Sequence, residues 1–347
     1  MIKYLGSKRT MLPLLNTLIG ASGATSGLDL FTGTTRVGQL MKQAGMFTTV
    51  VDTATYSEVF GKTYITLDSR SVNQSELIDA LDALNRLPGT DGYVTQKFCL
   101  EARYFQPKNG MRIDAIRSAI ESAYRGSWLY EPLLSSLISA ADKVDSTTGV
   151  QMAYLKTWSR RSHAELTLKL PELLVGEGRT IRTDATEALS QLHPVDLAYL
   201  DPPYNQHRYF GNYHVWESLV RWDHPDTYGV ANKRLDVRAP ENKSVFNSKL
   251  TGPEALNKLV ANLEAETLML SYNDEAWITK AELIEICRQR GEVALIEVDS
   301  KRYIGSQIGI YNKAGELVGS PGKKRNTEYL LIAGDSMRLK KMLDATS

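Results

Sequence analysis

The sequence predicts an α/β protein with a mostly parallel sheet and a helical insertion. Short apolar runs at 28–31, 48–51, 180–183 and 195–200 each end next to a polar residue, which is typical of buried parallel strands whose carboxyl ends face a ligand. Residues 70–175 show helical periodicity instead. A helical block of this length is too long for a single crossover, so we expect an inserted lobe.

The composition limits the class of protein. The chain has 347 residues, enough for a large core, with 42% hydrophobic and 23% charged residues, as in soluble globular proteins. A net charge of +1 means that any nucleic-acid surface must be a local patch. No apolar run is long enough for a membrane span, no signal-peptide stretch is visible, and two cysteines favour a reducing cytoplasm. The five histidines lack zinc-site spacing, so no metal is expected.

The first two predicted strands form the start of a nucleotide-binding unit. The run at 28–31 leads into a turn with Gly33 and Gly38, a helical pattern follows, and the run at 48–51 ends on Asp52. The Gly-x-Gly-x-x-Gly spacing that holds a pyrophosphate is absent. An acid at the end of the second strand can accept hydrogen bonds from both ribose hydroxyls. The unit suits an adenosine-containing ligand without phosphates, and a plain βαβ unit with a solvated acid is the alternative.

The strand predicted at 195–200 ends in Asp201, Pro202, Pro203 and Tyr204. Two consecutive prolines fix their own φ and force the preceding residue into extended geometry. The turn therefore holds a carboxylate, a backbone carbonyl and an aromatic ring in one stiff loop. Such a set can grip an amino group on a planar heterocycle, whereas an ordinary proline-rich turn is the alternative.

The last part of the chain completes the predicted sheet. We expect strands at 267–271, 293–298 and 327–333, the last two flanking a Gly-rich stretch and pairing as an antiparallel hairpin. Residues 223–250 are polar and locally basic, and they are expected to form a long mobile loop.

Four motifs occur in a telling order. They are Tyr-x-Gly-Ser-Lys at 4–8, Asp-Leu-Phe-x-Gly-x-x-x-Val-Gly at 29–38, the strand-end Asp52, and Asp-Pro-Pro-Tyr at 201–204. This order resembles the Dam-like class of DNA adenine-N6 methyltransferases, which use S-adenosylmethionine. The resemblance implies a Rossmann-like methyltransferase sheet, mostly parallel with a C-terminal antiparallel hairpin. It also implies a catalytic domain at 1–69 and 176–347 and an inserted helical target-recognition lobe at 70–175.

The resemblance assigns cofactor-binding roles to particular residues. Tyr4 and Lys8 match the residues that meet the methionine end of the cofactor. The cofactor loop is matched by Phe31 and Gly33, the ribose acid by Asp52, and the acid near the adenine by Asp184, with Asp201 at the reacting end. In one departure, the chain has Thr34-Thr35-Arg36 where many members of the class carry a second glycine.

The resemblance also assigns catalytic and substrate-binding roles. Asp201 to Tyr204 match the catalytic loop, and residues 205–214 resemble the loop that closes over the target base. The candidate base contacts are Tyr204, Arg208, Tyr209, Tyr213 and His214. Apart from the family, the Asp201 carboxylate and the Pro202 carbonyl can accept the two N–H bonds of adenine N6 for an in-line displacement, and Tyr204 can stack on a flipped base.

Several alternatives stay open at this point. Cytosine-C5 chemistry needs a thiolate, and Cys99 and Cys287 are expected to be packing residues. Cytosine-N4 methylation, methylation of RNA or of a protein amide, and a non-enzymatic DNA-binding module are the rivals. The expected partner is double-stranded DNA, with a cognate restriction nuclease that acts separately as a candidate second partner. The candidate phosphate contacts are Arg103, Tyr104, Lys108, Arg112, Arg117, Arg160, Arg161, the 233–249 segment and Lys323-Lys324-Arg325.

Overall fold

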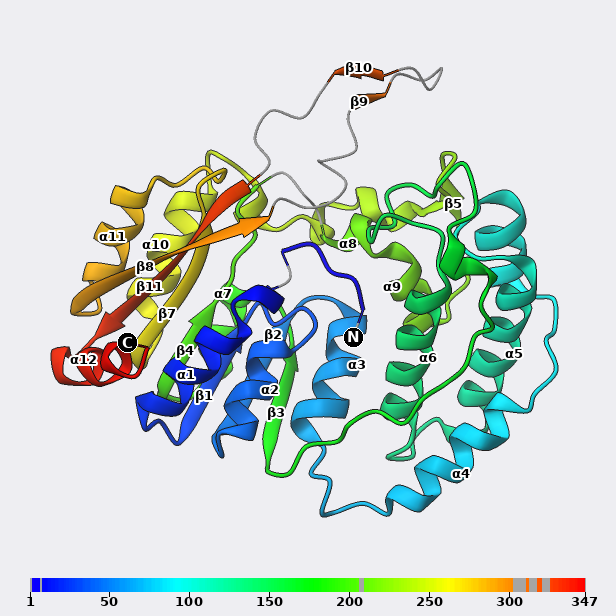
Figure 1. The fold of residues 1–347 in the computed structure, drawn as a ribbon, viewed down its shortest axis with the longest axis horizontal. Helices are drawn as coiled ribbons and strands as arrows, with labels where there is room; N and C mark the ends of the chain where they lie inside the picture. The colour runs from blue at the N-terminus through cyan, green and yellow to red at the C-terminus, as the bar shows by residue number, and fades with distance from the viewer. Residues whose placement is uncertain are drawn as a thin grey trace.

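The computed structural model describes residues 2–6, 8–205, 209–301, 310–311, 317–319 and 325–346. Its centre is a seven-stranded sheet in the order β3-β2-β1-β4-β7-β11-β8 (Figure 1). The strands are β1 (Ser26–Leu30), β2 (Phe47–Asp52), β3 (Gly178–Arg182), β4 (Val195–Leu200), β7 (Ala265–Asn273), β8 (Glu292–Lys301) and β11 (Arg325–Gly334). The first five strands in this order pair in parallel, and β11 lies antiparallel between β7 and β8. The predicted sheet with its C-terminal antiparallel hairpin is confirmed.

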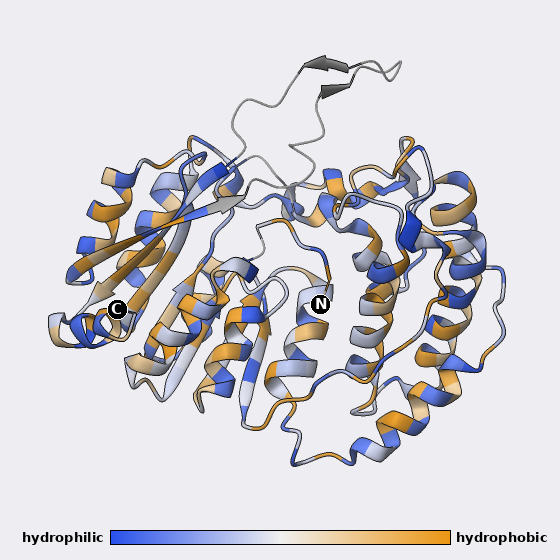
Figure 2. Cartoon of the chain, viewed as in Figure 1, coloured by the Kyte–Doolittle hydropathy of each residue, from blue (hydrophilic) through white to orange (hydrophobic). Residues whose placement is uncertain are grey.

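Helices cover both faces of the sheet. On one face lie α1 (Leu12–Ser22), α2 (Arg36–Gln43) and α12 (Ser336–Asp344), and on the other lie α7 (Ala185–Ala188), α10 (Gly252–Asn262) and α11 (Lys280–Arg288). The strands are largely hydrophobic, and the helices carry hydrophobic bands on one side (Figure 2). Two apolar cores therefore sandwich the sheet and hold its carboxyl edge rigid. Within the described ranges, no helix combines the length and hydrophobicity needed to cross a membrane.

A helical lobe lies beside the β3 edge of the sheet (Figure 1). It contains α4 (Gln74–Asn85), α5 (Pro107–Tyr124) and α6 (Tyr130–Val144), with a π-helical turn at Thr95–Glu101. Its apolar core also includes α3 (Thr55–Gly61) and α9 (His214–Arg221). The lobe is therefore built from the predicted helical block together with α3, which precedes it, and α9, which follows the Asp-Pro-Pro-Tyr motif.

Residues 223–250 are not the irregular loop expected from their composition. They contain the hairpin β5 (Thr227–Tyr228) and β6 (Lys233–Arg234), followed by three short 3-10 helices at Leu235–Arg238, Pro240–Asn242 and Val245–Asn247. A second short pair, β9 (Ile310–Tyr311) and β10 (Leu317–Gly319), lies within the Gly-rich stretch between β8 and β11. The sequence predicted neither pairing, because strands of two or three residues are too short to show an alternating pattern.

Candidate active site

The Asp-Pro-Pro-Tyr segment directly follows β4 at the carboxyl edge of the sheet. There β1 has β2 on one side and β4 on the other, so the chain connections diverge, which is where open α/β sheets bind ligands. Burial raises the pKa of Asp201 to about 6, although Lys8 opposes the shift. Pro202 is buried, and within the described residues its carbonyl accepts no hydrogen bond. Tyr204 packs edge-on against Tyr272, with ring centroids 5.5 Å apart.

Lys8 meets the catalytic segment from a 3-10 turn near the start of the chain. Its Nζ lies 3.0 Å from Oδ1 of Asp201 and 3.2 Å from Oε2 of Glu328. Burial alone would lower the pKa of Lys8, but these two carboxylates raise it well above its usual value, so the lysine is charged. The resemblance assigns Lys8 to the methionine end of the cofactor, and the structure places it against Asp201. Glu328, 320 residues away, carried no sequence signal.

A cavity of about 420 Å³ lies beside Asp201, a size typical of small-molecule sites. Five of the residues predicted to bind the cofactor line it: Tyr4, Phe31, Asp52, Asp184 and Asp201. They come from the N-terminal segment and from the carboxyl ends of β1, β2, β3 and β4. The two aromatic rings and three carboxylates fit an adenosine group that carries a positively charged substituent, since the rings can stack and the carboxylates can accept hydrogen bonds. Asn242, Lys243, Ser244 and Asn247 also line it.

Asp52 is held firmly at the end of β2. Its Oδ2 accepts the backbone N–H of Gly33 at 2.8 Å, and its Oδ1 accepts that of Ala54 at 3.0 Å. Burial raises the pKa of Asp52, and these backbone donors oppose the shift. Each carboxylate oxygen keeps further acceptor capacity. The predicted ribose acid is therefore fixed in orientation and still able to accept two hydroxyl hydrogen bonds.

We expect Asp52→Asn to weaken S-adenosylmethionine binding about tenfold or more. The substitution removes the charge and replaces one of the two carboxylate oxygens that would accept the ribose hydroxyls with an NH2 group. The amide oxygen can still hold one of the two loop N–H groups, so the fold should survive. Calorimetric titration of S-adenosylmethionine measures the effect. Asp79→Asn, on the exposed side of α4, is the matched control. Equal affinities for the two variants would contradict the ribose role of Asp52.

The loop between β1 and α2 has a strained backbone. Phe31 and Thr35 have φ values of +73° and +61°, a region that costs non-glycine residues about 1–3 kcal/mol. Thr35 belongs to Thr34-Thr35-Arg36, the stretch in which many members of the resembling class carry a second glycine. Asp29 is buried and supports the loop, because it accepts the Thr32 hydroxyl at 2.6 Å and the Gly38 N–H at 2.9 Å. Burial raises the pKa of Asp29 to about 7. Asp29 was not among the predicted site residues, although its position at the start of the Asp-Leu-Phe motif could have indicated it.

The ring of Tyr4 joins the N-terminal segment to the cavity. It stacks on Tyr213 and Tyr209, with centroids 4.7 Å and 5.4 Å away, and its hydroxyl lies 3.2 Å from that of Tyr56. Gly33 has a φ of +53°, and a Cβ there would lie 2.9 Å from the Tyr4 ring. Only glycine lets the loop approach the ring this closely.

The residues predicted to close over the target base separate in the structure. Tyr209 lines the cavity, whereas the side chains of Tyr213 and His214 are buried. Nε2 of His214 lies 2.9 Å from the carbonyl of Gln151 and 3.2 Å from the hydroxyl of Tyr104. Burial lowers the pKa of His214 to about 3, so it is a neutral core residue. The structure does not bring Tyr213 or His214 to a surface that a base would reach, and Arg208 lies outside the described residues.

Several groups expected to contact DNA are structural instead. Arg117 and Tyr104 are fully buried. The guanidinium of Arg112 donates to three backbone carbonyls, and that of Arg161 pairs with Asp145. The expectation of contact with DNA phosphates is wrong for Arg117 and Tyr104, because both side chains are buried inside the lobe. Arg112 and Arg161 are half-buried, and their guanidinium groups already bind partners within the lobe.

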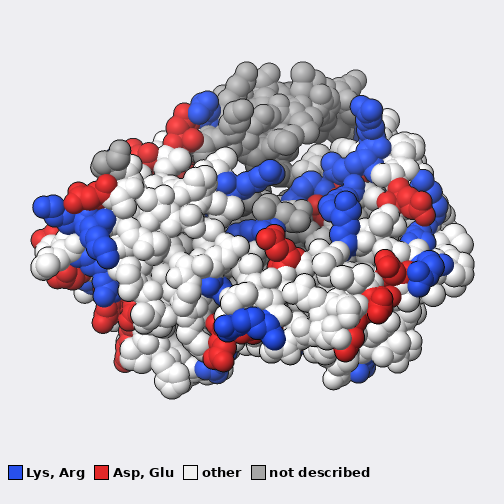
Figure 3. All heavy atoms as spheres, turned by 60° about the horizontal axis from the view of Figure 1, so that its bottom comes forward, with Lys and Arg blue, Asp and Glu red and all other residues white. Residues whose placement is uncertain are grey.

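Other cations remain on the surface. Lys and Arg side chains lie on both sides of the hollow at the centre of the face in Figure 3. Arg103 is half-buried over the ring of Trp158, Arg325 pairs with Asp299, and Lys323 and Lys324 lie outside the described residues. The exposed cations of the expected set, among the described residues, are Lys108, Arg160, Arg238, Lys243, Lys249 and Arg325.

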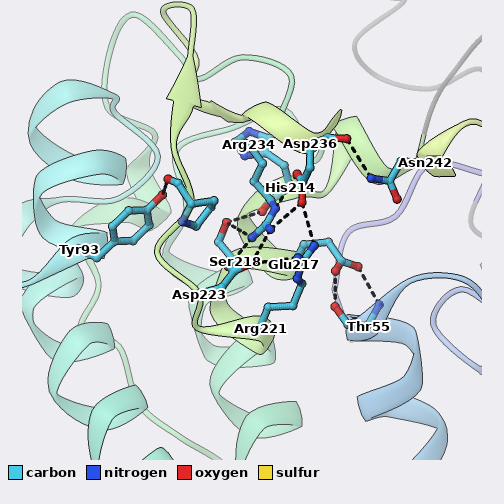
Figure 4. A network of polar contacts seen from close by, with 11 residues as sticks. Thr55, Tyr93, His214, Glu217, Ser218, Arg221, Asp223, Arg234, Asp236 and Asn242 are labelled. Atoms are coloured by element: carbon cyan, nitrogen blue, oxygen red, sulfur yellow. Dashed lines mark hydrogen bonds and ion pairs between the residues drawn. The ribbon is translucent and has the colours of Figure 1, made fainter. Parts of the chain in front are cut away.

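A buried polar network fixes the wall of the cavity formed by residues 242–247 (Figure 4). The guanidinium of Arg234, which is buried in the lobe, lies 2.7 Å from Asp223 and 2.8 Å from Asp236. The backbone carbonyl of Asp236 accepts the amide of Asn242 at 2.9 Å. Asn242 lines the cavity, so the basic segment 223–250 is packed against the cavity and contributes to its wall.

Glu217 joins the lobe to the ribose side of the cavity (Figure 4). This buried residue of α9 accepts the N–H of Thr55 at 2.8 Å and also the Thr55 hydroxyl. Thr55 begins α3, three residues after Asp52, so the carboxylate satisfies a free N–H at the helix N-terminus. Burial raises the pKa of Glu217, and the bonds from Thr55 oppose the shift. The contact therefore links α9 of the lobe to the segment that directly follows Asp52.

Comparison with known proteins agrees with this geometry. The family described as D12 class N6 adenine-specific DNA methyltransferase matches residues 4–286. The chain belongs to this family. The type II methyltransferase M.NlaIII of Neisseria lactamica is 29% identical, covering 87% of this chain and 92% of that protein. Modification methylase StsI of Streptococcus sanguinis is 31% identical over 87% of this chain and 48% of its own length. The type II methyltransferase M.FokI of Planomicrobium okeanokoites is 29% identical over 84% of this chain and 47% of its own length. The chain thus spans about half of the last two relatives.

Membership of this family confirms the resemblance found in the four motifs. It confirms the class of enzyme, a DNA methyltransferase specific for adenine N6, with S-adenosylmethionine as the cofactor and DNA as the substrate. It also decides between the open alternatives, because the family is defined by adenine N6 rather than by cytosine N4, RNA or a protein amide.

Proposed function

We propose that this chain methylates adenine N6 in duplex DNA through Asp201, Pro202, Pro203 and Tyr204. The observation that carries this assignment is the position of Asp201, which lines the cofactor cavity and follows β4 at the stiff Pro-Pro turn. An amine bound by this carboxylate would lie next to the cofactor. Lys8 and Glu328 add two further charges at the same point.

The chemistry follows from the acceptors in this segment. The lone pair of adenine N6 is delocalised into the ring, so the amine is a poor nucleophile. When bound, S-adenosylmethionine supplies a methyl group on a positively charged sulfur. The Asp201 carboxylate and the Pro202 carbonyl accept the two N–H bonds and direct the lone pair toward the cofactor cavity. The nitrogen becomes acidic as its bond to the methyl group forms, so a carboxylate with a pKa near 6 can take the proton.

The base must leave the duplex for this contact, because the amine cannot be reached inside the stack. Tyr204 is the proposed stacking partner for the flipped base, and Tyr209 and Arg208 belong to the segment that we expect to close on it. The helical lobe at 70–175 is the proposed target-recognition region, with 1–69 and 176–347 as the catalytic domain. The exposed lysines and arginines around the hollow in Figure 3 would bind phosphates.

The relatives support a role in restriction and modification, since they are described as type II methyltransferases and a modification methylase. We infer that a cognate nuclease acts as a separate protein on the same DNA sequence. Both cysteines are buried free thiols, which suits the reducing cytoplasm expected from the sequence.

The direct test is nucleoside analysis of duplex DNA after incubation with the protein and S-adenosylmethionine. We expect N6-methyladenine and no N4-methylcytosine. Parallel reactions with RNA and with protein should stay unmethylated. N4-methylcytosine as the product, or methylation confined to RNA or protein, would contradict the proposal. Sequencing the modified DNA then gives the recognition sequence.

The rate of methyl transfer should depend on the ionisation of Asp201. The carboxylate accepts an N–H bond only when it is deprotonated, and its pKa is about 6. We therefore expect kcat/KM to fall about tenfold per unit as the pH drops below about 6 and to level off above it. Initial rates between about pH 5 and 8 measure the profile, with S-adenosylmethionine binding followed in parallel. A flat profile over this range would count against Asp201 as the acceptor.

A further inference from the structure

Lys8 is shared between two carboxylates that reach it from opposite ends of the chain. Asp201 follows β4, and Glu328 lies on β11, the strand inserted within the antiparallel end of the sheet. The exposed fractions of the Lys8, Asp201 and Glu328 side chains are 7%, 21% and 13%, so water screens these charges only weakly.

The two contacts of Lys8 differ in kind. Lys8 donates a hydrogen bond to Oε2 of Glu328 at 3.2 Å. Oδ1 of Asp201 lies closer, at 3.0 Å, but it is buried and accepts no hydrogen bond within the described residues. The Lys8–Asp201 contact is an ion pair, and it lowers the pKa of Asp201 against the effect of burial. Asp201 keeps the acceptor capacity that an incoming N–H group would use.

Two tyrosines, Tyr199 and Tyr204, also interact electrostatically with Lys8. Burial raises the pKa of both tyrosine hydroxyls, so Tyr199 and Tyr204 are neutral near neutral pH. The cluster of Lys8, Asp201 and Glu328 therefore carries one positive and two negative charges. Its net charge of about −1 stabilises a positive charge that develops on an amine nitrogen beside Asp201.

We propose that Glu328 is a positioning residue for the methyl-transfer reaction, which holds Lys8 while Asp201 accepts the amine of the target base. This inference rests on the proposed function. Without Glu328, Lys8 would have Asp201 as its remaining carboxylate partner and would compete with the base for it. The cluster would also become neutral and would no longer favour positive charge on the nitrogen.

The test compares Glu328→Gln, which keeps the shape and removes the charge, with Glu328→Asp, which keeps the charge on a shorter side chain. Glu297→Gln on the neighbouring strand β8 is the matched control, since that half-exposed carboxylate pairs with Lys280 outside the site. We expect Glu328→Gln to lower the single-turnover rate about tenfold or more. The Kd for S-adenosylmethionine and the melting temperature should stay at wild-type values, and Glu328→Asp should recover part of the rate.

A double-mutant cycle with Lys8→Met shows whether Glu328 acts through Lys8. The effect of Glu328→Gln should largely disappear when Lys8 is absent. The inference is overturned if Glu328→Gln retains the wild-type rate, if its rate falls only in step with its melting temperature, or if its full effect persists without Lys8. Failure of the proposed function looks different, because the wild-type protein would then form no N6-methyladenine.

Discussion

Asp201→Ala is expected to abolish detectable methyl transfer, a loss of at least about a hundredfold to a thousandfold. The substitution removes the group that accepts one N–H bond of the amine and then takes its proton. Single-turnover assays with radiolabelled methyl donor measure this loss. Binding of S-adenosylmethionine should remain measurable, because Tyr4, Phe31, Asp52 and Asp184 still line the cavity.

Two further variants separate chemistry from folding. Asp201→Asn keeps the shape of the side chain and should be nearly as inactive, because a neutral amide is a weaker acceptor and cannot take the proton. Asp82→Ala removes an exposed carboxylate on α4 and should keep the wild-type rate. Full activity of Asp201→Ala would end the mechanism proposed here. Loss of cofactor binding together with activity would show instead that Asp201 mainly builds the cavity.

Arg117→Met is expected to destabilise the fold by about 3–5 kcal/mol, the scale of breaking a buried charged contact. The side chain of Arg117 is 0% exposed, and its Nε donates to the carbonyl of Leu219 at 2.6 Å. A second nitrogen donates to the carbonyl of Val220 and to the hydroxyl of Tyr130. Both carbonyls belong to the last turn of α9, so methionine would leave them buried without a donor.

Arg125→Met provides a matched control for this prediction. Arg125 pairs with the same carboxylate, Glu121, but its side chain is 75% exposed. Exposed ion pairs contribute little, so we expect a change of about 1 kcal/mol or less. Urea unfolding measures both variants. The salt dependence of DNA binding should be the same for folded Arg117→Met as for the wild type. If Arg117→Met kept the wild-type stability and showed a weaker salt dependence of DNA binding, Arg117 would be a DNA contact and this prediction would be wrong.

The strands and the catalytic turn could be predicted because local features specify them. Asp52 and Asp201 end apolar runs, and the Pro-Pro pair restricts the backbone whatever lies around it. The motifs also predict which residues meet at the cavity, because parallel strands bring their carboxyl ends to one edge of the sheet. Phe31, Asp52, Asp184 and Asp201 accordingly meet there.

Burial was the property that the sequence left open. Arg117 and His214 carry polar side chains in helical patterns, and the same pattern fits a solvated face or a buried one. His214 became a core residue because α9 packs into the lobe, and Arg117 became buried because it meets the carbonyl ends of that helix. Both outcomes depend on segments about 60 to 110 residues away, which periodicity does not report.

The sequence by itself determined the class of fold and the stiff turn at 201–204, since backbone restriction and strand periodicity act over a few residues. Tertiary structure alone decided which charges surround the reacting carboxylate. Lys8 and Glu328 lie 320 residues apart and meet at Asp201 only after β11 enters the sheet beside β7. Electrostatic contacts depend on distance in space and on exclusion of water, and both are fixed only when the whole sheet has formed.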